Sequence, residues 1–421
     1  MERRLKVLLS AYACEPDKGS EPGVGWNWVR QIAPFHEVWV ITRANNREPI
    51  EKALGEHPLP NAHFIYFDFP RWTRFWKRGQ RGVHLYYYLW QLGAYFVARE
   101  WHERVGFDIG HHVTFVNYWL PSFLALLPIP YIWGPVGGGE STPRAFRSAF
   151  SLRGRIYELA RDLSRWLGEH DPLVRLTARR AALGLTTTEE TAKRMRALGC
   201  PRVEVMSEAA LAEEEIEQLG KLPLRTALPF RVLSLGRLLH WKGFHLGLEP
   251  FAELQRAVPE SEYWLIGDGP ERKRLERLAD RLGLDGKVRF WGALARARAL
   301  ELLAECDVLI HPSLHDSGGW VCLEAMAAGR PVICLDLGGP AFQVTDETGI
   351  KVLPLSPEQA VRDLAAAMLK LATDPDLRAR MGKAGRQRIQ DDFSCDKKGD
   401  LINQMYLTVK TGNKVDHPLN S

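Results

Sequence analysis

The sequence of 421 residues contains no apolar run that is long enough to cross a membrane. A membrane-spanning helix needs about 18 or more consecutive apolar residues. The closest stretch, residues 85–101, is interrupted by Gln91, Gly93 and Arg99. We therefore expect a core or interfacial helix there and no transmembrane segment. Only a strand-length apolar run follows the basic N-terminus, which does not predict a secretory signal peptide.

Cysteine pairs and a large excess of charge are also missing. The six cysteines are scattered and none are spaced as CxxC, so we expect reduced core residues in a cytoplasmic protein. The formal net charge of +5 is small for this length and does not indicate a nucleic-acid partner. The DxD run at residues 374–376 precedes a predicted helix, and we interpret it as a helix cap rather than a metal site.

What the sequence does contain is a regular alternation of short apolar segments with longer amphipathic ones. This alternation is typical of parallel α/β sheets covered by helices. Strands are predicted in a first series at residues 6–13, 37–43, 63–69, 108–115, 130–136 and 183–189, and in a second at 230–236, 262–269, 287–293, 306–313 and 330–336. The fold class is therefore α/β, with two Rossmann-like domains facing each other across a cleft that is the expected active site.

A polar and then proline-containing segment separates the two series and sets the predicted boundaries. We expect an N-terminal domain at 1–205, a linker at 206–228 and a C-terminal domain at 229–390. The end of the chain predicts a C-terminal helix at 391–410 that crosses back to the first domain, and then a frayed tail at 411–421.

The loop after the first predicted strand contains Gly19, Gly23 and Gly25. A glycine turn followed by a helix N-terminus offers backbone N–H groups to an anion. The GxGxxG fingerprint is absent, however, and the second strand does not end in the usual acidic residue, so a dinucleotide site is weakly supported. An ordinary strand-to-helix turn without a ligand is the competing interpretation.

Two further loops follow strands of the second series. After the first, Arg237 and Lys242 flank a turn leading into a helix, where two cations could meet one phosphate; a solvated basic loop is equally compatible. After another, Asp316 lies in a loop and Glu324 in the helix that follows. The two carboxylates are either a catalytic pair or ligand holders, or Glu324 has a structural role. Gly318 and Gly319 let backbone amides approach a ligand.

These segments, taken together, resemble the family-4 retaining glycosyltransferases of the GT-B fold. The motifs are GRLLHWKG, LIGDGPERKRLERLADRLGLDGKVRFWG and HPSLHDSGGWVCLEAMAAGRPVICLDLGGP, and the resemblance covers essentially the whole chain. It implies an N-terminal acceptor-binding domain and a C-terminal nucleotide-sugar-binding domain. It also implies a hexosyltransferase-type enzyme with no cofactor, whose donor is a UDP-, GDP- or ADP-sugar.

The resemblance also implies roles for individual residues. Arg237 and Lys242 match the pair that binds the donor diphosphate. Glu324 matches the carboxylate that binds the ribose, and Asp316 matches a position that is usually Glu and contacts the donor sugar. His111 or His112 matches a histidine near the reacting sugar, the other being a buried core residue. The remaining donor-binding positions it implies are Gly23, Gly25, Gly236, Asp268, Trp291, Gly292, Leu294, Ser317, Gly318, Gly319, Trp320 and Val321.

Preorganised cations and amides that stabilise a departing diphosphate make an acid/base pair unnecessary. We therefore expect metal-independent transfer with retained anomeric configuration, to a saccharide or lipid-linked acceptor in polysaccharide or glycolipid biosynthesis. A catalytically silent GT-B protein that binds a nucleotide sugar or a partner in a polysaccharide-assembly complex is the alternative. The basic aromatic segment 71–81 predicts peripheral membrane contact through the N-terminal domain, with saccharide stacking or a solvated loop as alternatives.

Overall fold

The computed structural model describes residues 4–16, 18, 20–74, 82–114, 117–225 and 228–412, and the chain divides into two compact units. Unit 1 comprises Met1–Gly139, Arg161–Glu208 and Cys395–Ser421, and unit 2 comprises Glu140–Ala160 and Ala209–Ser394. Residues 140–160 thus group with unit 2, whereas the sequence analysis placed them in the N-terminal domain. Most of the predicted linker belongs to unit 2 as well.

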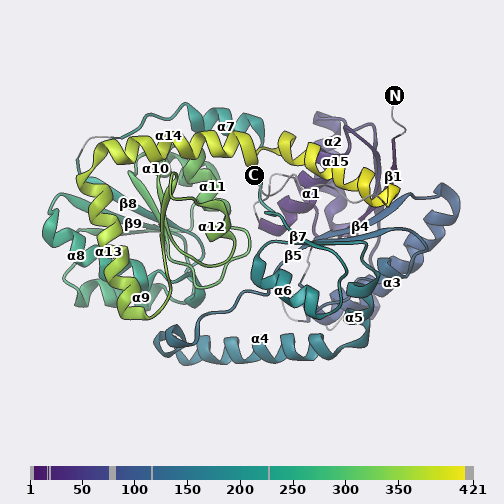
Figure 1. The fold of residues 1–421 in the computed structure, drawn as a ribbon, viewed down its shortest axis with the longest axis horizontal. Coiled ribbons are helices and arrows are strands. Elements are labelled where there is room, and N and C mark those ends of the chain that lie inside the picture. The colour runs from purple at the N-terminus through teal and green to yellow at the C-terminus, as the bar shows by residue number, and fades with distance from the viewer. Residues whose placement is uncertain are drawn as a thin grey trace. The chain divides into compact units, whose positions relative to one another are not determined.

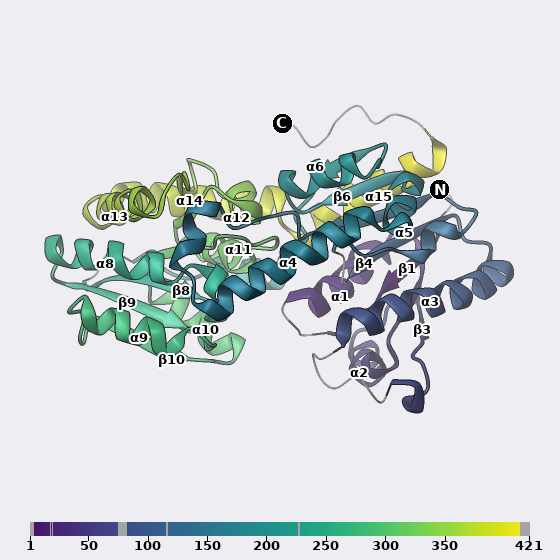
Figure 2. The same cartoon turned by 90° about the horizontal axis from the view of Figure 1, so that it is seen from below.

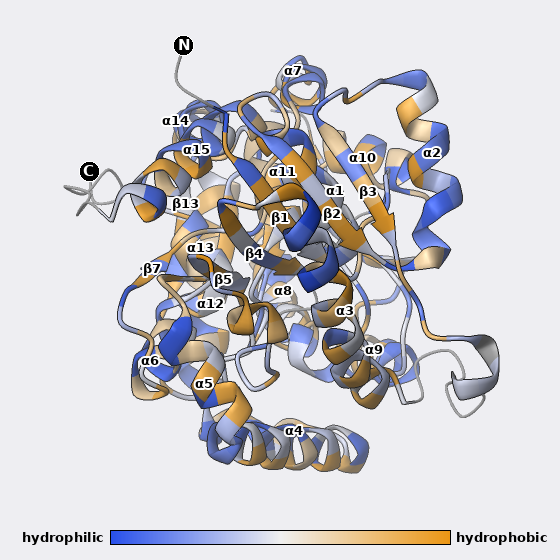
Figure 3. Cartoon of the chain, turned by 90° about the vertical axis from the view of Figure 1, so that its right-hand side faces the viewer, coloured by the Kyte–Doolittle hydropathy of each residue, from blue (hydrophilic) through white to orange (hydrophobic). Residues whose placement is uncertain are grey.

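Unit 1 is built on a seven-stranded parallel sheet in the order β3-β2-β1-β4-β5-β6-β7 (Figures 1 and 2). Its strands are β1 (Lys6–Ala11), β2 (Glu37–Thr42), β3 (Ala62–Tyr66), β4 (Ile109–Thr114), β5 (Tyr131–Val136), β6 (Leu183–Thr186) and β7 (Val203–Val205). Apolar residues dominate β2 and β3, which are largely orange in Figure 3. The almost fully buried β2 suits a parallel sheet covered by helices on both faces, whereas the edge strand β3 buries only Ile65.

The helices of unit 1 are α1 (Ser20–Ile32), α2 (Arg47–Glu56), α3 (Val83–Val105), α5 (Pro172–Arg180), α6 (Glu189–Ala197) and α15 (Cys395–Thr411), with short 3₁₀ turns η1 (Ala44–Asn46), η2 (Arg71–Arg74) and η3 (Phe123–Leu126). Helix α4 (Leu152–His170) continues from unit 2 into unit 1 at residue 161. The C-terminal helix α15 packs on α1. It therefore belongs to unit 1 although it follows the whole of unit 2 in the chain.

Unit 2 has a six-stranded parallel sheet in the order β10-β9-β8-β11-β12-β13. The strands are β8 (Phe230–Leu235), β9 (Ser261–Ile266), β10 (Val288–Gly292), β11 (Val308–His311), β12 (Val332–Leu335) and β13 (Gly349–Val352). Consecutive residues of one strand pack into different apolar clusters, as Val232 and Leu233 of β8 do. The sheet is thus buried on both faces, which is the Rossmann-like arrangement expected from the sequence.

The helices of unit 2 are α7 (Glu213–Gly220), α8 (His245–Ala257), α9 (Arg272–Arg281), α10 (Arg296–Ala304), α11 (Trp320–Ala327), α12 (Gly338–Gln343), α13 (Pro357–Thr373) and α14 (Pro375–Asp392), with 3₁₀ turns η4 (Arg144–Ala149) and η5 (His240–Lys242). Asp374 accepts a hydrogen bond of 2.8 Å from the N–H of Leu377, which confirms that the DxD run caps α14.

Each of the eleven predicted strands overlaps an observed one, whereas β7 and β13 were missed. These two strands have three and four residues and contain Glu204 and Lys351, so neither gives a strong apolar signal. The structure contains all six cysteines as free thiols, five of them buried, in agreement with the predicted core positions. None of the helices in the described ranges is long and apolar enough to span a bilayer.

Candidate functional site

Two loops of unit 2 meet at the carboxyl ends of the neighbouring strands β8 and β11. The N–H of Leu314, after β11, donates a hydrogen bond of 2.7 Å to the carbonyl oxygen of Trp241, after β8. Gly243 has a φ of 67°, and a Cβ there would lie 1.9 Å from the carbonyl oxygen of Pro312. Only glycine permits this approach, so the two loops form one closely packed structure.

Lys242 and Asp316 form an ion pair where these loops meet. The Nζ of Lys242 donates to the Oδ2 of Asp316, and the same oxygen lies 2.9 Å from the Nε2 of His311. The Asp316 side chain is 15% exposed and that of Lys242 is 21% exposed. The Asp316 carboxylate is therefore already held by two groups of unit 2, and His311 was not among the predicted site residues.

The charges of this cluster follow from its surroundings. Burial raises the pKa of Asp316, but the Lys242 ammonium and the hydrogen bond from His311 outweigh burial and hold that pKa well below its usual value. Burial also lowers the pKa of His311. Near neutral pH, an ionised Asp316 thus accepts from an ammonium and from the N–H of a neutral imidazole.

The loop that contains Asp316 is fixed from its other side by α12. The N–H of Gly339 donates to the carbonyl oxygen of Asp316 at 2.8 Å, and the Nε2 of Gln343 donates to that of Gly318 at 2.6 Å. Gly319 has a φ of 56° and begins α11, so Trp320 and Val321 form the first turn of that helix. Ser317, Gly318 and Gly319 lie in this braced loop, as the sequence analysis placed them.

Glu324 lies one turn into α11 and is 6% exposed. Its Oε1 accepts two hydrogen bonds from Arg296 at the start of α10, from Nε at 3.1 Å and from Nη2 at 2.6 Å. Burial raises the pKa of Glu324, and Arg296 opposes that shift. Arg296 also pairs with Glu215 of α7. The sequence analysis overlooked Arg296 because its partner is 28 residues away on another helix.

Arg237 differs from Lys242 because its guanidinium is exposed and makes no hydrogen bond or ion pair with any described part of the chain. It follows Gly236, whose φ is 151°, at the end of β8. The next residue, Leu238, donates its N–H to the carbonyl oxygen of the exposed Asp268, after β9, at 3.0 Å. Gly236, Arg237 and Asp268 therefore lie together at the same sheet edge.

The predicted base-enclosing segment ends β10. The carbonyl oxygen of Gly292, with a φ of 75°, accepts from the N–H of Gly267 at 2.8 Å. Trp291 and Leu294 pack against the apolar cluster that includes Trp264. The guanidinium of Arg289 lies 3.6 Å from the centre of the Trp291 ring. This segment is thus anchored in the core beside the ends of β8 and β9.

A second charged cluster of unit 2 lies next to Lys242 and Asp316 in the chain and was not predicted. Glu158 of α4 is 1% exposed, and its Oε1 lies 3.1 Å from the Nε2 of His240 and 3.1 Å from the Nε2 of His315. Trp241 stacks on His315 with 5.3 Å between ring centres. Residues 140–160 are thus bound to the two site loops through a buried carboxylate 82 and 157 residues away.

In unit 1, Gly23 and Gly25 lie within α1, which begins at Ser20, and not in the loop after β1 where they were predicted. A Cβ on Gly23 would lie 2.0 Å from the carbonyl oxygen of Lys18, and one on Gly25 would lie 2.1 Å from that of Ala13. Glycine is therefore required by the close packing of α1 against the preceding loop. This packing explains both glycines without a ligand, and Gly19 lies outside the described residues.

His111 and His112 at the end of β4 point to opposite faces of the sheet, as neighbouring strand residues must. The His111 ring contacts the hydroxyl of Tyr406 and the carbonyl oxygen of Gly134, both at 2.6 Å. The Nε2 of His112 lies 2.8 Å from the hydroxyl of Tyr87.

Both histidines are buried, at 0% and 1% exposure, because helices cover both faces. A buried core position was expected for one of them, and the structure gives it to both. Burial lowers the pKa of His111 to about 3 and that of His112 to about 4, so both rings are neutral.

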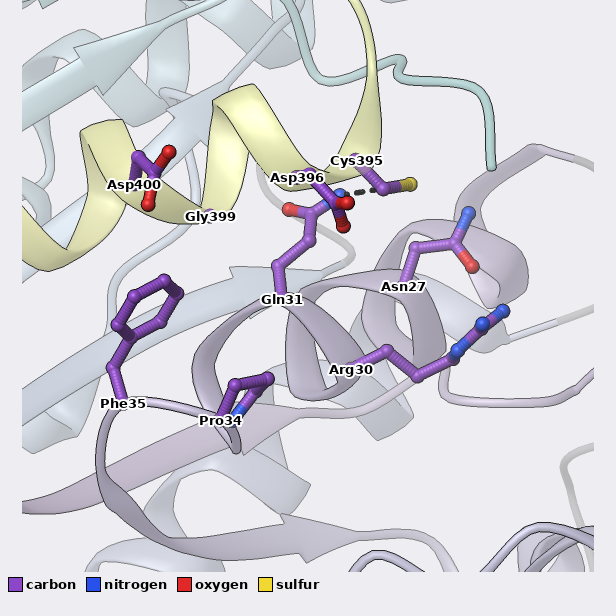
Figure 4. A pocket seen from close by; sticks show the side chains of 9 residues that line it. All are labelled: Asn27, Arg30, Gln31, Pro34, Phe35, Cys395, Asp396, Gly399 and Asp400. Carbon is purple, nitrogen blue, oxygen red and sulfur yellow. Dashed lines mark hydrogen bonds between the residues drawn. The ribbon is translucent and has the colours of Figure 1, made fainter. Parts of the chain in front are cut away.

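A hollow of about 370 Å³ in unit 1 lies between α1 and α15 and contains none of the predicted site residues (Figure 4). Arg30 and Phe35 line one side and Asp396 and Asp400 the other. Of the basic aromatic segment 71–81, residues 75–81 lie outside the described residues, and Trp72 is 78% exposed.

Comparison with known proteins identifies the unit that carries the ion pair. Residues 224–388 match the family of glycosyl transferases group 1. They form a glycosyl transferases group 1 domain. This domain contains Arg237, Lys242, Asp316 and Glu324, but Glu158 lies outside the matched residues.

Two curated relatives match this chain in part. A lipopolysaccharide core biosynthesis glycosyltransferase, LpsD of Rhizobium meliloti, is 35% identical over 212 residues, which cover 49% of this chain and 58% of the relative. Glycogen synthase of Mycobacterium tuberculosis is 31% identical over 191 residues, which cover 45% of each chain. The chain thus spans about half the length of these relatives.

Solved structures share the fold over nearly the whole chain. Sucrose-phosphate synthase from Thermosynechococcus elongatus has a TM-score of 0.66 at 20% identity and covers 97% of this chain and 100% of its own. Anabaena HepE, solved with UDP and glucose, has a TM-score of 0.60 at 19% identity and covers 96% and 100%. The α/β fold with two Rossmann-like domains, known as GT-B, is therefore confirmed.

Proposed function

We propose that this protein is a retaining glycosyltransferase that moves a sugar from a nucleotide-sugar donor to a saccharide or lipid-linked acceptor. The observation that carries the proposal is the arrangement at the carboxyl ends of β8 and β11. There, Lys242 pairs with Asp316 and Arg237 is exposed, within a glycosyl transferases group 1 domain. Names of relatives that make lipopolysaccharide or glycogen support a role in polysaccharide or glycolipid biosynthesis.

The proposed chemistry needs cations more than an acid/base pair. As the sugar–phosphate bond breaks, negative charge develops on the departing diphosphate, where Arg237 and Lys242 stabilise it. An ammonium has three N–H donors, so Lys242 keeps donors for phosphate oxygens while one is bound to Asp316. Glu324, oriented by Arg296, binds the ribose hydroxyls, and Asp316 binds the sugar.

The acceptor hydroxyl attacks the anomeric carbon from the face that the diphosphate leaves, so the anomeric configuration is retained. The new glycosidic bond forms as the bond from the anomeric carbon to the diphosphate oxygen breaks, and the departing diphosphate takes the hydroxyl proton. We propose that no metal ion takes part, because Arg237 and Lys242 supply the positive charge at the diphosphate. A carboxylate held by Lys242 and His311 is a poor general base, because its pKa is far below neutral. Asp316 is therefore proposed as a sugar-binding group.

The donor is proposed to be a UDP-, GDP- or ADP-sugar. HepE, solved with UDP and glucose, makes UDP-glucose the first donor to test. Thermal shift of the full chain with each class of donor identifies the base. Release of the nucleoside diphosphate then measures turnover, which Lys242→Ala should abolish.

Lys273→Ala, which removes an exposed lysine from α9 of the same unit, is the matched control and should keep activity. Donor binding without any turnover, in the presence of a range of acceptors, would favour the silent GT-B protein instead. No shift with any nucleotide sugar would contradict the proposed function and would leave, of the alternative, only a silent protein that binds a partner.

We propose unit 1 as the acceptor-binding part and the cytoplasm as the setting, consistent with six free cysteines. A contact of segment 71–81 with a membrane surface is part of this proposal, supported by its five cations and by exposed Trp72. Neutralising the cations and repeating liposome flotation tests the contact, and unchanged flotation would remove it.

A further inference from the structure

Helix α4 has its apolar side turned to solvent. Six large apolar residues, spaced so that they share one face of the helix, are each at least 55% exposed: Leu152, Ile156, Leu159, Leu163, Trp166 and Leu167. We refer to them as the α4 stripe. A helix at a protein surface ordinarily buries this side and exposes its charges, so α4 is inverted, and its ribbon alternates between orange and blue in Figure 3.

Charged residues fix this orientation separately in the two units. Within unit 2, Glu158 is 1% exposed and contacts His240 and His315. Within unit 1, Arg165 is 3% exposed and donates to the hydroxyl of Tyr118 at 3.1 Å and to the carbonyl oxygen of Gly139 at 2.7 Å. Rotating α4 to bury the stripe would break these buried contacts. The outward position of the stripe is thus part of the fold.

The charge of the residues around the stripe is predominantly positive. Residues 141–180 contain nine arginines and four carboxylates, and the exposed arginines are Arg144, Arg153, Arg155, Arg175, Arg179 and Arg180. The carboxylates Glu158, Asp162, Glu169 and Asp171 are buried or only partly exposed. Glu169, for example, accepts from the hydroxyl of Tyr118 and from Arg194. The exposed charges of residues 141–180 are therefore mostly cationic, although the side chain of Asp162 is 37% exposed.

We propose that the α4 stripe docks on a bilayer that contains anionic lipids. Leucine, isoleucine and tryptophan at the headgroup boundary, with arginines reaching anionic headgroups, are the composition of helices that lie in a membrane surface. A second copy of this chain fits less well, because two α4 surfaces would bring six exposed arginines of each copy together with few carboxylates to meet them. A nucleic acid would meet the arginines but leave the stripe in water.

Flotation of the full chain with vesicles tests the proposal. The wild type should float with phosphatidylcholine vesicles that contain phosphatidylglycerol, and much less with phosphatidylcholine alone. Leu159→Glu with Leu163→Glu should lower the partition at least about tenfold, since it places charge in the inserted face. Arg144→Gln with Arg153→Gln should lower binding to the anionic vesicles only, and most at low salt.

The matched control is Leu353→Glu with Leu355→Glu, which adds the same charge at two leucines of unit 2 that are 56% and 70% exposed. It should float like the wild type. Glu is well tolerated at exposed helix positions, so the α4 variant should keep the wild-type melting temperature. An unchanged melting temperature shows that the variant folds. The α4 variant leaves segment 71–81 intact, so its loss of binding is assigned to α4.

Two results would overturn the proposal. One is equal flotation of the wild type and the α4 variant, or no flotation of either. The other is a wild-type dimer in lipid-free solution that light scattering finds monomeric in the α4 variant, which would make a second copy the partner. Flotation does not depend on sugar transfer, so a protein that floats without turnover contradicts the proposed function and leaves this proposal standing.

Discussion

Lys242 and Asp316 are 74 residues apart in the sequence and form an ion pair at the carboxyl edge of the second sheet. Each side chain follows a different strand, and β8 and β11 are neighbours in that sheet. Parallel strands end at the same edge, so the topology places the two loops together. The pair links the residue proposed to bind the diphosphate to the residue proposed to bind the sugar.

Lys242→Met should destabilise the protein as well as inactivate it. The substitution leaves the largely buried Asp316 carboxylate with His311 as its partner, and breaking such a pair costs about 2 to 4 kcal/mol of unfolding free energy. Adding Asp316→Asn should restore part of that loss, which a double-mutant cycle in urea measures. Lys273→Met is the control. A double variant as unstable as the sum of the single changes would show that the two residues do not interact.

Arg296 should position Glu324 for the ribose. Arg296→Ala removes two charge-assisted hydrogen bonds and should weaken donor binding by about ten- to a hundredfold. It should also make donor binding fall as the pH is lowered, because Arg296 opposes the raised pKa of Glu324. Calorimetric titration across pH measures both effects. Glu215→Gln, which alters the other partner of Arg296, should have a much smaller effect, and equal effects would contradict the assignment.

Stability should fall as the pH is lowered from about 6.5 to about 4, because buried histidines stay neutral in the folded chain. The pKa of His112 is lowered to about 4 by burial, whereas an unfolded chain takes up that proton near pH 6.5. The stabilisation is complete above the unfolded pKa and is lost as the pH falls toward the folded one, by up to about 3 kcal/mol.

His112→Gln should reduce this acid sensitivity without abolishing it, since His36 and His245 have similarly lowered pKa values. Melting temperatures at about pH 7.5 and about pH 5 check the prediction. His57→Gln on the surface should behave like the wild type. The same loss in His112→Gln as in the wild type would contradict the prediction, because it would mean that the pKa of His112 is nearly the same in the folded and the unfolded chain.

Tyr406 should contribute to the stability of unit 1 through His111. Tyr406→Phe removes the hydroxyl 2.6 Å from the Nδ1 of a fully buried ring, which should cost about 1 to 3 kcal/mol of unfolding free energy. Urea denaturation of the full chain measures the loss. Tyr95→Phe on α3 is the control and should change stability by only about a few tenths of a kcal/mol.

EDTA should leave sugar transfer unchanged. The proposed site supplies its positive charge from Arg237 and Lys242, and charges placed in advance stabilise a departing diphosphate without a metal ion. Turnover with and without chelator, followed by addition of Mg²⁺ or Mn²⁺, makes the measurement. Strong inhibition by EDTA that Mg²⁺ reverses would require a revised mechanism.

The sequence was sufficient to predict the fold class and most of the strands, because apolar segments of parallel strands and the periodicity of helices are local properties. It also placed Lys242 and Asp316 on loops after strands of one sheet. It failed where the signal was short, as at β7 and β13, and it did not show that both His111 and His112 are buried.

The groups that these residues contact could be identified only in the folded chain. Glu158 joins His240 and His315, Arg296 holds Glu324, and Tyr406 from the last helix reaches His111. The periodicity of a sequence cannot predict contacts between residues that lie 28 to 295 positions apart. The outward stripe of α4 has the same origin: an amphipathic pattern predicts a helix with two faces, but buried partners decide which of them meets the solvent.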